Sequence, residues 1–324
     1  MDRYLFVHFR ERSTPDGEQV YFSVSRDGFH WEEINGGAPV LWAYYGRKGV
    51  RDHTAVRNPE TGKVTILSTD LSIAYGVREW RKDFWRKAGT EGSTSLAVWE
   101  SDDLVNWTEE RLLNLSPRKK EKAFGCVWAP DAIWIKEKGA YLLHWSSSVP
   151  AESGEKKAVY AAWTRDFRDI REPFLLYGEK ENEVIDSALY EENGAYYLFL
   201  KYGAPSRIRL LRSESPTGPF SFVTAFDEAM RSVEEGLYEA PTAVRLPDGT
   251  WALFLDFYGA SGSEQGYRPF LAGSLESGAF KKADGVFSFP YRFKHGTILC
   301  ITEEEYLRLK NHDWTDKGFA GYFD

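Results

Sequence analysis

The sequence predicts an all-β fold, a five-bladed β-propeller closed by both chain termini, forming one domain over residues 1–324. Two observations lead to this prediction. A short apolar strand pattern recurs five times along the chain. In addition, an ionisable residue opens the innermost strand of each of the five units. Radial repetition of four-stranded sheets leaves only short, protected edges, so the repeat favours a propeller over an open sheet.

The repeated strand is rich in aromatic and aliphatic side chains, and its five copies span residues 4–8, 64–68, 141–145, 196–200 and 251–255. Four copies follow a turn signal, such as Asn193-Gly194 or Asp248-Gly249, of the kind that joins antiparallel strands. A further strand and a closing turn follow each copy. Each unit is therefore about four strands long, which matches one propeller blade.

The first unit lacks a strand before its repeated segment, while residues 295–301 form an unassigned strand at the other end of the chain. We expect the late strand to complete the first blade. Helical patterns are otherwise nearly absent, but Thr302 and Glu305 form a capping box before Tyr306. A short helix is therefore predicted near the C-terminus.

Composition excludes several classes of protein. The formal net charge is −8, which argues against a nucleic-acid partner. No apolar run reaches the roughly 20 residues that a membrane-spanning helix needs, so we expect no membrane partner. The first residues lack a leader-like pattern, so we expect either a cytoplasmic location or an export signal that lies outside this sequence. Aromatic residues reach 16% and suit either a carbohydrate site or strands in general. Cys126 and Cys300 are expected to be buried free thiols.

An ionisable residue opens the innermost strand of every unit: Asp52, Asp131, Asp186, Glu239 and His295. Because innermost strands line the propeller axis, we expect these side chains to converge at one mouth of the central channel. One Asp alone often caps a strand, but five residues at equivalent positions favour a functional pocket. Converging carboxylates repel one another, so at least one should have a raised pKa. Glycoside hydrolysis needs such a pair, one proton donor and one carboxylate that activates water or attacks carbon.

One detail breaks this regularity. Residues 53–57 match residues 241–245 almost letter for letter, which aligns Asp52 with Ala240. Glu239 therefore lies one residue earlier than Asp52 in its strand. We expect its longer side chain to reach the pocket from a different level along the axis.

Five segments, one per blade and in the right order, resemble those of glycoside hydrolase family 43: residues 49–52, 128–131, 184–186, 239–241 and 295–297. The resemblance implies a five-bladed propeller that hydrolyses with inversion, with Asp52 as general base, Glu239 as general acid and Asp186 orienting and tuning that acid. His295 resembles an axial histidine that faces a water or a metal ion, often calcium, while no cofactor is required for the chemistry. Trp128 and Asp131 match a motif that lines the pocket.

The chain departs from many relatives after each carboxylate, where His53, Ser187 and Ala240 stand. These changes leave the acids in place and put the substrate in doubt; His53 could contact sugar or merely pack. The long segment 70–94 carries Trp80 and Trp85. Long loops are often functional, so we expect it to fold over the pocket and supply both rings to substrate, although a surface excursion is the alternative.

The resemblance implies α-L-arabinofuranosidase or β-D-xylosidase activity. We favour an exo-acting enzyme that releases terminal α-L-arabinofuranose from plant-type oligosaccharides such as those of hemicellulose. A β-D-xylosidase, a galactofuranosidase and a non-catalytic carbohydrate-binding propeller remain open alternatives. An inverting pair of carboxyl groups should be about 6.5–9.5 Å apart, which leaves room for the attacking water.

Overall fold

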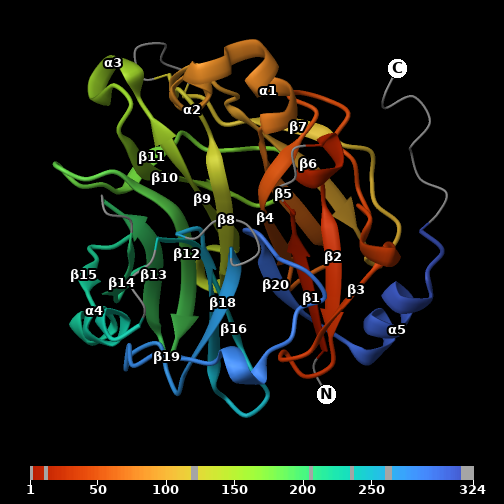
Figure 1. The fold of residues 1–324 in the computed structure, drawn as a ribbon. Helices are drawn as coiled ribbons and strands as arrows, with labels where there is room; N and C mark the ends of the chain where they lie inside the picture. The colour runs from red at the N-terminus through yellow and green to blue at the C-terminus, as the bar shows by residue number, and fades with distance from the viewer. Residues whose placement is uncertain are drawn as a thin grey trace.

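The computed structural model describes residues 3–10, 14–117, 123–203, 207–233, 237–259 and 265–314. These residues form five four-stranded antiparallel sheets arranged as the blades of a propeller (Figure 1). The prediction of an all-β, five-bladed propeller is confirmed. In blade order the strands are β20 (Thr297–Ile301), β1 (Arg3–His8), β2 (Tyr21–Ser25) and β3 (Trp31–Glu33); β4 (Val50–Arg57), β5 (Val64–Asp70), β6 (Ser95–Ser101) and β7 (Arg111–Asn114); β8 (Trp128–Ile135), β9 (Ala140–Ser148), β10 (Lys157–Thr164) and β11 (Phe174–Tyr177); β12 (Val184–Glu192), β13 (Ala195–Tyr202), β14 (Arg207–Ser213) and β15 (Ser221–Phe222); β16 (Tyr238–Arg245), β17 (Trp251–Phe257), β18 (Gly266–Ala272) and β19 (Lys281–Lys282).

The ring closes through the first and last strands of the chain. β20 pairs antiparallel with β1, with Arg3 opposite Ile301 and Val7 opposite Thr297. The first blade is therefore built from both ends of the sequence, as predicted. The apolar repeat supplies the second strand of every blade, and its side chains are nearly all buried. They form the hydrophobic layers between neighbouring blades.

The described residues form more helices around the ring than the sequence indicated. The expected C-terminal helix is α5 (Glu303–Asn311), whose capping box forms as predicted between Thr302 and Glu305. The prediction missed α1 (Ile73–Trp80) and α2 (Phe84–Thr90), together with the shorter α3 (Pro150–Ser153) and α4 (Thr224–Arg231). Helices α1 and α2 have Gly and several aromatic residues at helical positions, and they are held by contacts to the blades rather than by strong helix propensity.

The two cysteines differ in environment. Cys126 is buried, and burial raises the pKa of its thiol to about 11. Cys300 is exposed, which corrects the expectation of two buried thiols. It lies one residue before the end of β20 and is exposed although the next residue, Ile301, is buried, because successive side chains of a strand point to opposite faces.

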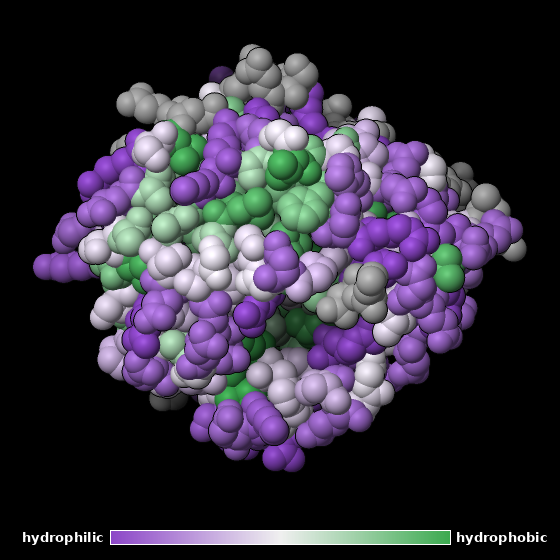
Figure 2. Space-filling view, turned by 90° about the horizontal axis from the view of Figure 1, so that it is seen from below, coloured by the Kyte–Doolittle hydropathy of each residue, from purple (hydrophilic) through white to green (hydrophobic). Residues whose placement is uncertain are grey.

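The two ends of the propeller axis differ. Helices α1 and α2 lie over one end, at the top of Figure 1. The opposite end, seen from below in Figure 2, has a central hollow in which hydrophobic side chains are visible; a broad hydrophobic patch lies above the hollow in this view, and hydrophilic residues cover most of the rest of the face. Among the described residues, no helix is long and apolar enough to cross a membrane.

Candidate active site

A β-bulge interrupts four of the five innermost strands at the same place. In each, two residues oppose one on the second strand of the blade: Asp52-His53, Ala129-Pro130, Asp186-Ser187 and Ala240-Pro241. The first residue of every bulge has a left-handed φ, between 48° and 54°. Bulges bend a strand and re-aim its side chains, and they are common beside active sites.

This bulge fixes the relative heights of the candidate residues. Asp52 and Asp186 occupy the first bulge position, where Ala240 is their counterpart in β16, as the sequence alignment predicted. Glu239 stands one residue earlier, at the level of Arg51 in β4 and Trp128 in β8. The acid and the two aspartates thus reach the axis from two different levels.

Side chains from both levels line a single cavity of about 460 Å³. It is lined by both first-position aspartates and by all four residues that precede a bulge, together with residues from the neighbouring strands and loops: Phe9, Arg51, Asp52, Leu71, Trp85, Trp128, Ile185, Asp186, Lys201, Glu239, Asp256, Tyr258, Gln265, Lys294 and His295. The structure therefore brings Asp52, Asp186, Glu239 and His295 into one site, with Trp85 and Trp128 on its wall.

Asp52 is paired with the axial histidine. Its Oδ1 lies 3.2 Å from Nδ1 of His295, and both side chains are largely buried. Burial by itself would raise the pKa of Asp52, but the hydrogen bond and charge of His295 and the charge of Arg51 outweigh it and hold the pKa at about 2. For His295, burial disfavours the charged imidazole and by itself would lower the pKa. The negative charges of Asp52, Asp186 and Glu239 outweigh burial and raise the pKa of His295 overall. Asp52 is therefore an ionised carboxylate at neutral pH.

Asp186 has the opposite character. Burial, together with the nearby charges of Glu239 and Asp52, raises its pKa from 3.8 to about 6 despite the opposing charges of His295 and Lys201. Its backbone N–H donates to Ser146 Oγ over 3.1 Å, and its Oδ2 accepts from Ala240 N over 3.3 Å. The carboxyl is thus anchored to the strand that carries Glu239.

Glu239 has a cationic partner. Lys201 Nζ donates to Glu239 Oε2 over 2.6 Å, and the same ammonium lies 4.7 Å from the ring centre of Tyr258. Although burial disfavours the ammonium, Glu239 and Asp186 raise the pKa of Lys201 well above its usual value. The cavity therefore holds a charged lysine beside the residue expected to be the acid.

The segment 70–94 does lie against the cavity, as one of the two expectations had it. Trp85 of α2 lines the wall while remaining 53% exposed, and its ring meets that of Trp128 edge-on at 6.3 Å. Glu18 holds α1 in place, because its Oε2 accepts from Ile73 N over 2.6 Å while its Oε1 lies 3.1 Å from Arg51 Nη1. The helix pair is therefore tied to a residue of the cavity wall.

Three residues expected to contact substrate lie off the cavity wall. His53 is the second residue of its bulge and points into the protein, where Nε2 lies 3.2 Å from Gln19 O and Nδ1 lies 2.6 Å from Ser68 Oγ; burial lowers its pKa to about 4. Of the two environments left open for His53, the structure has the packed one. Trp80 packs against Phe84 and the Arg47 guanidinium instead.

Asp131 is the third of these residues, and the expectation of five equivalent positions is wrong for it. It follows the bulge of β8 and sits at the level of Thr54 in β4. Its Oδ1 accepts from Thr54 Oγ1 over 2.9 Å and its Oδ2 from Leu189 N over 3.1 Å. The carboxylate therefore ties three blades together below the cavity.

The side chains around His295 do not fit a calcium site built by the protein. Calcium takes six to eight oxygen ligands. His295 Nδ1 is engaged by Asp52, and the described part of the chain contains no group of three or more His, Cys, Asp or Glu side chains placed to hold a metal ion. No step of the reaction is therefore assigned to a metal.

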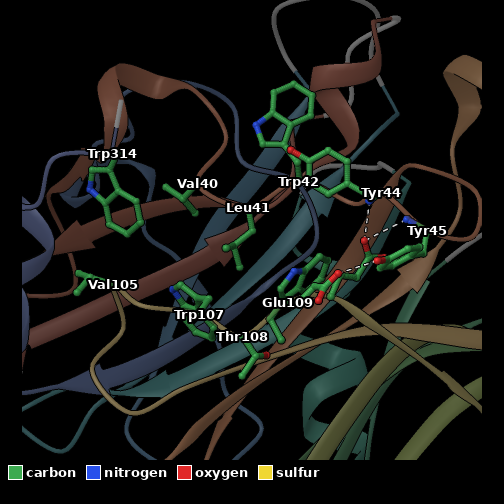
Figure 3. Close-up of a pocket in the computed structure, with 12 residues that line it drawn as sticks. Val40, Leu41, Trp42, Tyr44, Tyr45, Val105, Trp107, Thr108, Glu109 and Trp314 are labelled. Atoms are coloured by element: carbon green, nitrogen blue, oxygen red, sulfur yellow. Dashed lines mark hydrogen bonds between the residues drawn. The ribbon is translucent and has the colours of Figure 1, made fainter. Parts of the chain in front are cut away.

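A second cavity, of about 370 Å³, lies on the outside of the ring and is lined by aromatic residues that include Tyr45 and Trp107 (Figure 3). Its two carboxylates are already bonded within the protein. Glu109 accepts from Tyr45 Oη over 2.7 Å, and Glu110 accepts from Tyr44 N over 2.6 Å. This cavity lacks converging acid and base groups, so the axial cavity is the candidate active site.

Sequence reasoning missed several residues of the axial cavity, above all Lys201, Asp256, Lys294 and Arg51. Three of them lie away from the innermost strands that the sequence pattern singled out. Lys201 and Asp256 are on second strands, and Lys294 is in the approach to β20. A signal was available: once the repeats are aligned, Lys201 and Asp256 stand opposite the residues that precede a bulge. Such positions face the axis alongside the expected acids.

Residues 1–307 match a family model described as "Probable glycosyl hydrolase domain", which is related to glycoside hydrolase family 43. An α-L-arabinofuranosidase of Bifidobacterium longum subsp. longum is 27% identical over 219 residues, covering 61% of this chain and 19% of that protein. The chain thus spans about one fifth of the length of this curated relative.

Solved structures share the fold at low sequence identity. An endo-1,4-β-xylanase from Bacteroides thetaiotaomicron superposes with a TM-score of 0.58 at 14% identity, covering 91% of this chain and 93% of that one. An α-L-arabinanase from Penicillium chrysogenum, solved with arabinobiose, has a TM-score of 0.54 at 16% identity and covers 86% and 77%. At these identities the likeness establishes the propeller fold and leaves the substrate to be argued from the site.

Proposed function

Because the chain belongs to the glycoside hydrolase family related to family 43, we propose that it releases terminal α-L-arabinofuranose from oligosaccharides with inversion at the anomeric carbon. The observation that carries the proposal is the convergence of Asp52, Asp186 and Glu239 on one cavity. Asp52 acts as general base and Glu239 as general acid. Asp186 positions Glu239 through the backbone of the next residue.

The protonation states support these roles. A general base must be ionised before the reaction, and the low pKa of Asp52, about 2, provides that. The proton of the attacking water passes to Asp52 as its oxygen bonds to the anomeric carbon. The proton of Glu239 passes to the glycosidic oxygen, which takes the electron pair of the breaking bond.

Charge pairing in the cavity favours a neutral sugar. Each cation on the wall has a carboxylate partner: Arg51 with Glu18 at 3.1 Å, Lys201 with Glu239 at 2.6 Å, Lys294 with Asp256 at 2.6 Å and His295 with Asp52 at 3.2 Å. A uronic acid would bring an additional negative charge to carboxylates that already repel one another. The rings of Trp85 and Trp128 offer apolar faces to the CH groups of a pentose.

The choice of arabinofuranose is supported by the curated relative, which is an α-L-arabinofuranosidase. Helix α2 and Trp85 border the cavity on one side, which suits a terminal sugar better than the middle of a polymer. We further propose that the chemistry needs no metal. A β-D-xylosidase is the second candidate, because a xylanase is among the structures that share the fold.

The test is a screen of nitrophenyl α-L-arabinofuranoside, β-D-xyloside and galactofuranoside, followed by arabino-oligosaccharides. We expect the arabinofuranoside to be the preferred substrate. Glu239→Gln should lower turnover of the oligosaccharide by about 10²–10⁴-fold, the usual contribution of acid–base catalysis. Glu109→Gln, the same change in the outer cavity, is the matched control and should leave turnover unchanged. Equal and near-zero rates for the wild type and Glu239→Gln would support a binding propeller instead.

A further inference from the structure

The aligned blades single out one residue that the proposed reaction has not used. On the second strand of blades two to five, one residue stands opposite the position before the bulge: Thr69, Ser146, Lys201 and Asp256. In two of these blades it is a hydroxyl that binds the next blade. Thr69 Oγ1 accepts from Ala129 N over 2.8 Å, and Ser146 Oγ accepts from Asp186 N over 3.1 Å.

Lys201 breaks this pattern. An ammonium group has three donors and no acceptor, so it cannot receive the N–H of the next bulge, which belongs to Ala240. That N–H is instead accepted by Asp186 Oδ2. Lys201 turns its Nζ to the Oε2 of Glu239, the residue immediately before Ala240. A structural bond between blades is thus replaced by a bond to the proposed acid.

The charges around this pair come from every neighbouring element. Glu239 and Lys201 are faced by Asp52 from β4, Asp186 from β12, Asp256 and Tyr258 from β17 and the residue after it, and Lys294 and His295 from the approach to β20. Asp256 is bonded to Lys294 at 2.6 Å and Asp52 to His295 at 3.2 Å. Lys201 is therefore the cation that bonds directly to Glu239 among the described residues of the cavity.

We propose that Lys201 is a positioning residue, whose ammonium holds Glu239 in the cavity and strengthens it as an acid by stabilising the carboxylate left after proton transfer. The inference rests on the proposed function. When the glycosidic bond breaks, the Glu239 proton moves to the leaving oxygen and negative charge develops on Glu239. An ammonium 2.6 Å away stabilises that charge as it forms.

A cation bonded to a general acid has two measurable effects. It stabilises the charge left on the acid after proton transfer, and its removal moves the alkaline limb of the activity profile. Neither effect would follow if Lys201 only filled space.

The experiment compares wild type, Lys201→Met, Lys201→Arg and Lys310→Met. Lys310 forms a surface ion pair with Glu32 at 2.8 Å and serves as the matched control. We expect Lys201→Met to move the alkaline limb of kcat/KM up by about one pH unit or more, as loss of an adjacent opposite charge does. It should also slow substrates with sugar leaving groups by about ten-fold more than dinitrophenyl glycosides, which need little acid assistance. Lys201→Arg should restore most of both effects.

An unchanged pH profile and equal losses on both leaving groups in Lys201→Met, with wild-type activity intact, would overturn the inference while the proposed function stands. Absence of wild-type activity on every glycoside would instead refute the function. Whether the Lys201–Glu239 ion pair forms can be tested separately by nuclear magnetic resonance of the Lys201 ammonium. This measurement also tests the inference if Lys201→Met fails to fold. Glu239→Gln should lower the pKa of Lys201, and an unchanged Lys201 signal would show that the pair does not form.

Discussion

Replacing Asp186 with Asn should stabilise the protein, and the gain should grow with pH. The two side chains have nearly the same shape, and the Asn oxygen can still accept from Ala240 N. Asp186 has a folded-state pKa of about 6 and an ordinary value of 3.8. Between these two pH values the folded protein holds a proton that the unfolded chain has released, so wild-type stability falls as pH rises.

The size of the effect follows from the same numbers. The two pKa values differ by about two pH units, and each unit is worth about 1.4 kcal/mol, which gives about 3 kcal/mol. Asp186 contributes this stability fully below pH 3.8 and has lost it once the pH exceeds about 6. Asn does not titrate, so the Asp186→Asn variant escapes the loss.

The assay is urea denaturation of wild type and Asp186→Asn at pH values from 4 to 8. The difference in unfolding free energy between the two proteins should increase by about 3 kcal/mol across this range, with most of the change below pH 7. Asp102→Asn changes an exposed side chain and should give a flat difference. A flat or shrinking difference for Asp186→Asn would refute the argument that burial raises the pKa of this carboxyl.

Two further predictions concern the cavity wall and the metal. Trp85→Ala removes an aromatic face from the wall and should raise KM by about ten-fold or more with a smaller change in kcat, since burying such a side chain is worth roughly 1.5–3 kcal/mol. Trp80 lies off the wall in the same helix pair, so Trp80→Ala should change KM much less. Equal effects of the two substitutions would contradict the placement of the two rings. Dialysis against EDTA should leave kcat/KM unchanged, because the described side chains around His295 provide no cluster of metal ligands; a loss of activity that calcium restores would show that the donor set had been misjudged.

The sequence was sufficient to predict the blades because the repeated strand is both apolar and periodic. It also predicted the offset between Asp52 and Glu239, because residues 53–57 and 241–245 keep the same letters around the bulge. What it could not provide was the bulge itself. In the bulge two residues of the innermost strand oppose one residue of the second strand, which shifts the direction of every later side chain. This shift places Asp131 below the cavity and turns His53 into the protein.

Contacts between blades were likewise hidden. Lys201 lies 38 positions before Glu239 in the chain, and no spacing rule connects them. Only the register of β13 against β12 brings the lysine to the level of the next blade's acid. Helices α1 and α2 were missed because they are held by tertiary contacts, such as Glu18 to the start of α1, that a local pattern does not contain.

The central claim, that Asp52 and Glu239 form an inverting acid–base pair, is tested most directly by the anomer that is released first. Proton nuclear magnetic resonance during the first minutes of hydrolysis of an α-L-arabinofuranoside distinguishes the two anomers before they interconvert. The account predicts that β-L-arabinofuranose appears first and that the α-anomer grows in later by mutarotation. Initial release of the α-anomer would show retention and would contradict the roles assigned to both residues.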